Sequence, residues 1–322
     1  MKFALAFAVL VAGAPNMQDK VLRVGIIGLD TSHVTAFTDL LNNEKNPNHL
    51  PGLKVVAAYK GGSNDIKDSY GRLEGFTKTL QEKYGVEIVD SIPALCEKVD
   101  AVLLESVDGR PHLEQVKPVF AAKKRVFIDK PLAGCWKDGV EIARLSKESG
   151  TPFFSASSIR FYESIIKTKQ DPELGKIIGC ESFGHFSTEP HHPDLFWYGV
   201  HAVEGLYSVM GPGCESVTRV DTNDYMVVVG KWKDGRIGTF RGMKKGGKEY
   251  GVTVFGEKAE RSSLGVKGKN GYANLVVEIA KFFQTGIPPV SPEECVEVLA
   301  FMQAADLSKE RGGAPARLDE LK

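Results

Sequence analysis

Lys130 stands at a position where its ammonium group could take part in catalysis. The apolar run at 125–128 comes shortly before it, and Pro131 follows directly. We expect this run to be a buried parallel strand, and doubly wound folds bind their ligands at the carboxyl ends of such strands. The position therefore favours a catalytic lysine over the alternative, a surface lysine at the end of a strand.

A second group of reactive side chains lies at the start of a helix predicted over 198–210. Trp197, His201 and Glu204 are spaced by four and then three residues, which places them on one helix face. His201 suits general-base catalysis because its pKa lies near neutrality. We expect Glu204 to hold His201 or to bind a substrate hydroxyl. Trp197 and Tyr198 are the predicted substrate contacts, by ring stacking and a hydroxyl group. The alternative for His201 is a histidine satisfied on a buried helix.

The turn after the apolar run 21–27 is a candidate phosphate-binding loop. Gly28 ends the run, and Thr31 and Ser32 are favourable first residues for a helix. Their hydroxyl groups can donate to a phosphate at the helix N-terminus. Asp30 stands beside the same positive end of the helix dipole, where its carboxylate would compete with a phosphate. Two interpretations stay open: a dinucleotide loop that includes these residues, or a turn that no longer binds a dinucleotide tightly.

Further cofactor contacts are predicted at the same edge of the sheet. Lys60 follows the strand expected over 53–59, where dinucleotide-binding domains place an acid for the ribose hydroxyls. A lysine there would pair with a 2′-phosphate, which favours NADP over NAD; the alternative is a solvated loop lysine. Ser106 ends the strand expected over 99–106, and His112 begins the next helix. We assign both to the cofactor site.

The segment 185–201 is rich in histidines, acids and aromatic residues. Its His-His-Pro-Asp sequence at 191–194 lacks the helical i, i+4 spacing of common zinc motifs, so we expect no metal. A polar and aromatic loop that lines a carbohydrate cleft is the favoured interpretation. Arg160 is expected to reach this cleft and contact the substrate, with a surface arginine as the alternative.

The hydrophobic pattern divides the chain into two domains. Up to residue 157, apolar strand-like runs alternate with helical segments, which predicts an α/β fold with a doubly wound Rossmann sheet. After residue 158, strands follow one another with few helices, which predicts an α+β domain with a large, mostly antiparallel open sheet. We assign 20–157 to dinucleotide binding and 158–322 to substrate binding and oligomerisation. Helices are expected at about 31–41, 69–84, 92–98, 112–122, 137–149, 198–210, 272–284 and 292–310, and strands of the second domain at 176–186, 216–221, 224–232, 237–242 and 250–255.

Composition excludes several classes of protein. The 322 residues hold 41 basic and 41 acidic side chains, so the net charge is zero and a nucleic-acid-binding surface is not expected. No stretch after the N-terminus approaches the roughly 20 apolar residues of a membrane span. The five cysteines are far apart and form no Cys-x-x-Cys pair, which argues against a disulfide framework.

The first residues have the pattern of a secretory signal peptide. Lys2 precedes an apolar run at 3–11, and small residues follow up to Ala14. We therefore expect residues 1–14 to be removed and the protein to be exported. The alternative is a translation start at Met17, which would make the protein cytoplasmic.

Several segments, in their order and spacing, resemble the Gfo/Idh/MocA (glucose–fructose oxidoreductase / inositol dehydrogenase) family. The resemblance implies NADP or NAD beside a carbohydrate substrate at the interface of the two domains, in a homo-oligomer. It also implies that Lys130 hydrogen-bonds the reacting hydroxyl. Only Gly28 keeps the family's three-glycine pattern, and Trp197 replaces the first carboxylate of its helical motif. The matching segments are VGIIG at 24–28, VDAVLLES at 99–106, DKPLAG at 129–134, SSIRF at 157–161, GVHAVEGLYSVMG at 199–211 and the tail from 287.

Three functions follow from this pattern. The first is an NAD(P)-dependent oxidoreductase acting on a sugar, polyol or related carbohydrate by hydride transfer. The second is a glycosidase or lyase that works without net redox change through a tightly bound NAD(P). The third is a non-catalytic sugar-binding or sensor protein.

Overall fold

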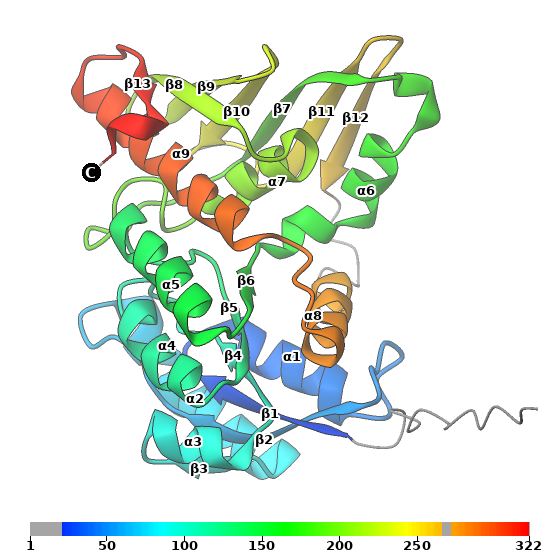
Figure 1. Ribbon diagram of the computed structural model, residues 1–322, viewed down its shortest axis with the longest axis vertical. Helices are drawn as coiled ribbons and strands as arrows, with labels where there is room; N and C mark the ends of the chain where they lie inside the picture. The colour runs from blue at the N-terminus through cyan, green and yellow to red at the C-terminus, as the bar shows by residue number, and fades with distance from the viewer. Residues whose placement is uncertain (1–20, 266–271, 322) are drawn as a thin grey trace, which may run out of the picture.

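The computed structural model describes residues 21–265 and 272–321, which form two lobes around two sheets (Figure 1). The lower sheet has six parallel strands in the order β3-β2-β1-β4-β5-β6. This order reverses between β1 and β4, where dinucleotide-binding folds open a crevice. The predicted Rossmann sheet is therefore confirmed. Its strands are β1 (Leu22–Ile27), β2 (Leu53–Tyr59), β3 (Glu87–Val89), β4 (Ala101–Leu104), β5 (Arg125–Ile128) and β6 (Phe153–Ser155).

The helices of this lobe begin and end where local chemistry allows. Thr31 is extended, and its side chain accepts from the backbone N–H of His33, which caps α1. Gly85 and Gly150 end α2 and α5 in the left-handed conformation, which glycine adopts at little cost. The helices are α1 (Ser32–Asn42), α2 (Lys67–Tyr84), α3 (Ile92–Lys98), α4 (His112–Ala121) and α5 (Trp136–Ser149).

The second lobe is built on a seven-stranded sheet in the order β12-β11-β7-β10-β9-β8-β13. Its neighbours pair antiparallel except β7 and β10, which are parallel because a helix and two strands intervene between them in the chain. The prediction of a mostly antiparallel sheet is thus confirmed. The strands are β7 (Ile177–His185), β8 (Cys214–Asp221), β9 (Tyr225–Trp232), β10 (Ile237–Met243), β11 (Tyr250–Gly256), β12 (Glu260–Gly265) and β13 (Ala316–Arg317).

Helices cover one face of this second sheet and leave the other open. Helix α7 (Val200–Met210) packs on β7 and β10, and α9 (Pro292–Glu310) packs on β8 (Figure 1). Side chains alternate along β9, so that Val228 is buried and Val229 is exposed. The open face therefore carries exposed apolar side chains.

The two lobes are interlocked by helices from the end of the chain. Helix α8 (Ala273–Thr285) packs against α1 of the first lobe, and α9 packs against α5 and β6. No helix of the described residues is long and apolar enough to cross a membrane. Short elements that the sequence did not predict complete the second lobe. These elements include α6 (Glu163–Lys169), β12, β13, and the 3-10 helices Ser158–Phe161, Pro172–Leu174 and Leu318–Glu320.

Candidate functional site

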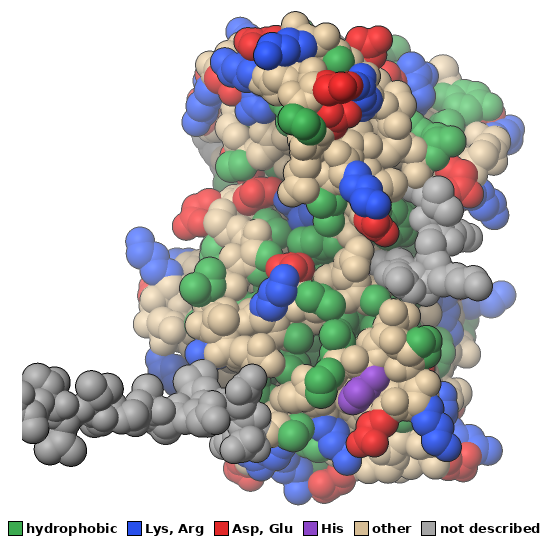
Figure 2. All heavy atoms as spheres, turned by 90° about the vertical axis from the view of Figure 1, so that its right-hand side faces the viewer, with side chains coloured by type: hydrophobic (Ala, Val, Ile, Leu, Met, Phe, Trp, Pro, Cys, Tyr) green, Lys and Arg blue, Asp and Glu red, His purple; other side chains and the backbone are tan. Residues whose placement is uncertain are grey.

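A cavity of about 970 Å³ lies between the lobes and takes its walls from both. The first lobe supplies the N-terminal turn of α1 and Lys130, and the second lobe supplies Tyr198, His201 and Tyr250. Figure 2 shows the side of the molecule that carries α8, where hydrophobic side chains gather at the height at which the lobes meet. An apolar cavity with a few polar groups is the usual form of a small-molecule site.

Lys130 is almost completely buried, with 5% of its surface exposed, and it lines the cavity. Its Nζ lies 5.4 Å from the centroid of the Tyr198 ring. No hydrogen bond or ion pair of Nζ occurs with any residue in the part of the chain that the structure describes. An ammonium group that lines a cavity without a hydrogen-bond or ion-pair partner is available to a ligand oxygen.

His201 lines the same cavity from the first turn of α7. Its Nδ1 lies 2.7 Å from Oγ of Ser157, and its ring packs against Tyr198 and Tyr250. Burial lowers the pKa of His201 well below its ordinary value, and the nearby Lys130 ammonium lowers it further. His201 is therefore neutral near pH 7 and able to accept a proton.

Glu204 and Arg160 differ from the sequence-based expectation because they bind each other. Nε of Arg160 donates to Oε2 of Glu204 at 2.7 Å, and its NH1 donates to Oε1 of Glu294 at 2.5 Å. All three side chains lie away from the cavity wall. Ser157 instead of Glu204 contacts His201, and neither Glu204 nor Arg160 reaches the substrate cavity.

Of Trp197 and Tyr198, both predicted to contact the substrate, only one lies at the cavity. Trp197 is buried in a small cluster with Ile66 and Val107 and does not line the cavity. Tyr198 does line it, beneath the Lys130 ammonium. Of the two aromatic residues predicted to contact substrate, only Tyr198 is placed to do so.

Among the predicted cofactor residues, Thr31 and Ser32 line the cavity at the N-terminus of α1. Thr31 is the N-cap, while the Ser32 side chain is exposed. Together with Lys130 they fit a phosphate and an adjoining ring, because helix N-termini and ammonium groups both attract anions. When bound, a nicotinamide dinucleotide would place a phosphate and an adjoining ring beside Thr31, Ser32 and Lys130.

Four other predicted cofactor residues are used inside the protein. The Asp30 carboxylate accepts from Ser69 Oγ at 2.6 Å and from the N–H of Val107 at 3.0 Å. These bonds hold Asp30 away from the cavity. Burial raises the pKa of its carboxyl group. Gly28 has a φ of 86°, and a Cβ there would lie 2.3 Å from Oγ of Ser106. The backbone conformation and the packing against Ser106 therefore require a glycine here.

Ser106 and His112 are likewise internal. Oγ of Ser106 donates to Gln115, and the buried His112 ring lies between the carbonyl oxygens of Ser106 and Leu132. Burial lowers the pKa of His112. Lys60 lies at the surface, where its Nζ pairs with Glu74 at 2.9 Å, and it does not line the cavity.

The loops that follow β2 and β4 are joined by a polar cluster. Oγ of Ser63 donates to Asp108 at 2.5 Å, and Arg110 pairs with Asp65 at 2.8 Å and with Asp108 at 2.7 Å. His192 of the second lobe lies 2.9 Å from Asp108. Although burial opposes it, the nearby His192 ring and the hydrogen bonds from Arg110 and Ser63 lower the pKa of Asp108. Asp108 is thus a charged centre that links three loops.

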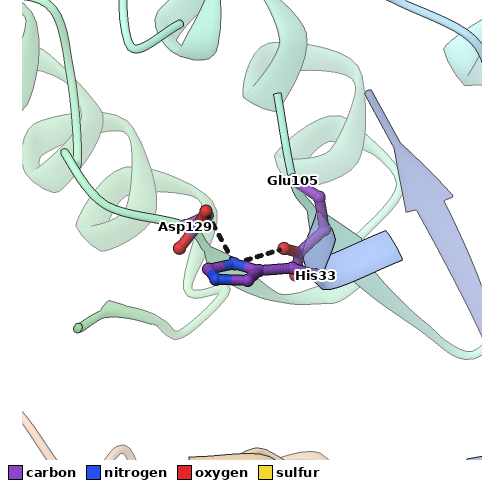
Figure 3. Close-up of side chains that lie close together, drawn as sticks. All are labelled: His33, Glu105 and Asp129. Atoms are coloured by element: carbon purple, nitrogen blue, oxygen red, sulfur yellow. Dashed lines mark ion pairs between the residues drawn. The ribbon is translucent and has the colours of Figure 1, made fainter. Parts of the chain in front are cut away.

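The sequence analysis missed a buried triad beside Lys130, formed by His33, Glu105 and Asp129 (Figure 3). Nδ1 of His33 lies 2.9 Å from Asp129 Oδ2 and 3.4 Å from Glu105 Oε2. Burial raises the pKa of Glu105 to about 7. Burial opposes ionisation of Asp129 too, but His33 and Lys130 lower its pKa to about 2. A signal was present: both acids directly follow apolar strands.

Comparison with known proteins agrees with this geometry. The fold defines the class of this protein: two lobes, one with a Rossmann sheet and one with an open mixed sheet, and between them an apolar cavity with a few polar groups. Residues 22–157 match the family described as "Oxidoreductase family, NAD-binding Rossmann fold" (GFO_IDH_MocA). Residues 22–157 are thus similar to the NAD-binding domain of the Gfo/Idh/MocA family, which agrees with the resemblance inferred from the sequence.

The similar proteins are distant in sequence. A 2,7-anhydro-N-acetylneuraminate hydratase from Mediterraneibacter gnavus is 24% identical over 166 residues, which are 45% of this chain and 43% of the hydratase. The chain thus spans less than half the length of this curated relative.

Solved structures share the fold over nearly the whole chain. A probable dehydrogenase from Thermotoga maritima has a TM-score of 0.76 at 23% identity and covers 94% of this chain and 100% of its own. A scyllo-inositol dehydrogenase from Lactobacillus casei, solved with NAD(H) and scyllo-inositol, has a TM-score of 0.76 at 12% identity, with 93% and 100% covered.

Proposed function

We propose that this protein is an NAD(P)-dependent oxidoreductase that acts on a sugar, polyol or related carbohydrate. The observation that carries the proposal is the pairing of Lys130, a buried ammonium without a described partner, with the neutral His201 in one cavity. Similarity of residues 22–157 to a family with an NAD-binding Rossmann fold supports the cofactor class. Inositol dehydrogenases among the similar structures support a polyhydroxylated substrate.

Lys130, His201 and Tyr198 of the cavity wall, with Ser157 behind His201, each have a task in this reaction. The bound nicotinamide supplies the acceptor for a hydride from the substrate's carbinol carbon. His201 takes the hydroxyl proton, and Ser157 holds its Nδ1 so that the ring stays oriented. Lys130 donates to the same substrate oxygen and stabilises the negative charge that develops on it. Tyr198 packs against both groups and excludes water.

The experiment that tests the proposal begins with what the purified protein already holds. Protein purified under native conditions is denatured, and released small molecules are identified by mass spectrometry. It is then assayed for NAD(P)H formation against a panel of polyols and sugars. Release or binding of NAD(P) with substrate-dependent NAD(P)H formation supports the proposal. Failure to bind either dinucleotide would favour the non-catalytic sugar-binding alternative.

A second candidate, a lyase or hydratase with tightly held NAD(P), is favoured by the similarity to the M. gnavus hydratase. In that case the hydride would return to the substrate within each cycle. Product would then form without added dinucleotide and without net NAD(P)H. Comparing turnover with and without added cofactor separates this candidate from the first.

We further propose that the open face of the second sheet is the contact of a homo-oligomer. It carries the exposed apolar side chains Val220, Val229, Ile237 and Phe255. Apolar side chains gathered on one uncovered sheet face are typical of protein–protein contacts. Light scattering after gel filtration should give a multiple of the chain mass, and Val229→Glu should reduce it. A wild-type monomer would refute this contact.

Export is proposed from the N-terminal sequence alone, since residues 1–14 lie outside the described residues. The first strand begins at Leu22, so cleavage near Ala14 leaves the sheet intact. We expect a mature N-terminus between Ala14 and Gln18, found by intact-mass analysis of secreted or periplasmic protein. Retention of Met1, or a start at Met17, would contradict export.

A further inference from the structure

Three side chains from three elements converge beside the cavity. Glu105 and Asp129 directly follow β4 and β5, and Leu104 and Ile128 are register partners in those strands. The two carboxylates therefore lie side by side at the carboxyl edge of the sheet. His33, in the first turn of α1, brings its ring to both of them (Figure 3).

These groups are buried, yet four of their polar atoms have no hydrogen bonds within residues 21–265 and 272–321. Glu105 and Asp129 are fully buried. Both carboxylate oxygens of Glu105, Oδ2 of Asp129 and Nδ1 of His33 lack a hydrogen-bond partner. Oδ1 of Asp129 is already satisfied by the N–H of Lys130 at 2.8 Å, so Oδ2 is the atom left facing His33. Buried carboxylate oxygens without partners carry a high desolvation cost.

A charged histidine alone does not satisfy the cluster. The Nδ1–H group can point at only one oxygen, and its direction is not aligned for a hydrogen bond with Asp129 despite the 2.9 Å separation. The Glu105 carboxylate, whose Oε2 lies 3.4 Å from Nδ1, would still lack a hydrogen bond. One nitrogen and two carboxylate oxygens within 4.8 Å of one another form instead the donor set of a metal site.

We propose that His33, Glu105 and Asp129 bind one divalent transition-metal ion of the zinc class. Imidazole nitrogen with carboxylate oxygen suits such ions, and three protein ligands leave a further position for water or a ligand oxygen. The ion neutralises both buried carboxylates. Because His33 also lines the cavity, the bound ion would lie next to the substrate site and would add positive charge beside Lys130.

The test uses the full-length protein and metal ions alone. Protein stripped with EDTA is titrated separately with Zn²⁺, Mn²⁺ and Co²⁺ by calorimetry, and native protein is analysed for bound metal by mass spectrometry. We expect one ion per chain. Glu105→Gln should weaken binding at least about 100-fold, because it removes a charged ligand. The matched control, His191→Gln, removes an exposed histidine that also contacts carboxylates and should leave metal binding unchanged.

A second measurement does not depend on the folding of a variant. The wild-type melting temperature should rise when the stripped protein receives the ion that binds, and EDTA should reverse the rise. Absence of binding by all three ions overturns the proposal. Binding that Glu105→Gln leaves intact, or that His191→Gln removes, assigns the ion to a surface site and overturns it too. These outcomes do not involve NAD(P) or turnover, so they are independent of the proposed oxidoreductase activity.

Discussion

Replacing Lys130 by methionine tests the centre of the proposed site. Methionine keeps an unbranched apolar stem of similar length but removes the ammonium group that faces the cavity. In the proposed reaction this group contacts the oxygen on which charge develops. Loss of one such donor typically costs about 2.7–4 kcal/mol in the transition state, or a factor of about 10²–10³ in kcat.

The same change should leave the fold intact. Nζ of Lys130 has no hydrogen-bond or ion-pair partner among the described residues, so its removal breaks only its contact with the Tyr198 ring. Because its charge also stabilises the neighbouring Asp129 carboxylate, we expect the melting temperature of Lys130→Met to fall slightly below that of the wild type while the variant stays folded at the assay temperature. A fall in activity would then reflect lost chemistry and not unfolding.

The assay measures kcat and KM separately with the substrate found by the polyol and sugar screen. The control is Lys78→Met, which removes an exposed lysine on α2 and should change neither constant. A kcat of Lys130→Met within about threefold of the wild type would refute the role, since it corresponds to less than about 1 kcal/mol.

The remaining predictions concern cofactor choice and pH. If Lys60 leaves Glu74 to bind a 2′-phosphate, NADP should bind at least as tightly as NAD in fluorescence titrations; a clear NAD preference would contradict this. The kcat/KM should stay level as the pH falls through 6.5, since the pKa of His201 lies well below this value; a decline centred at 6.5 would contradict this lowering of the His201 pKa. Burial raises the pKa of Asp306 from 3.8 to about 7 even though Arg219 opposes this shift. Between these pH values the folded state holds one proton more than the unfolded state, so the folded protein loses stability as the pH rises from 3.8 to 7. Asp306→Asn should therefore be more stable than the wild type at pH 8, by up to about 4 kcal/mol in denaturant unfolding, with no difference below pH 4; a less stable variant at pH 8 would contradict the sign.

Residues whose position depends on a local pattern were predicted well. The strand at 125–128 and the helix at 198–210 follow from apolar runs and periodicity, so the placement of Lys130 and His201 at one cavity could be anticipated. Strand ends and helix faces are set by short stretches of sequence. The two-lobed fold was predictable for the same reason.

Pairings between distant residues were not predictable. Glu204 was expected beside His201, but Arg160, 44 residues earlier, takes its carboxylate. His33 meets acids that lie at the ends of two other strands, and no local pattern specifies that meeting. Several side chains that the sequence singled out thus form hydrogen bonds or ion pairs inside the protein, with partners that are distant in the sequence.

The return of α8 to the first lobe has a consequence for how the protein folds. Tyr272, just before α8, packs its ring edge against His33 and Phe37 of α1, and α9 then runs along α5. The chain thus crosses between the lobes more than once, and a fragment ending near residue 157 would expose the α1 surface that α8 covers. We therefore expect the lobes to unfold in a single cooperative transition, so that neither half behaves as a module that could be exchanged between proteins by itself.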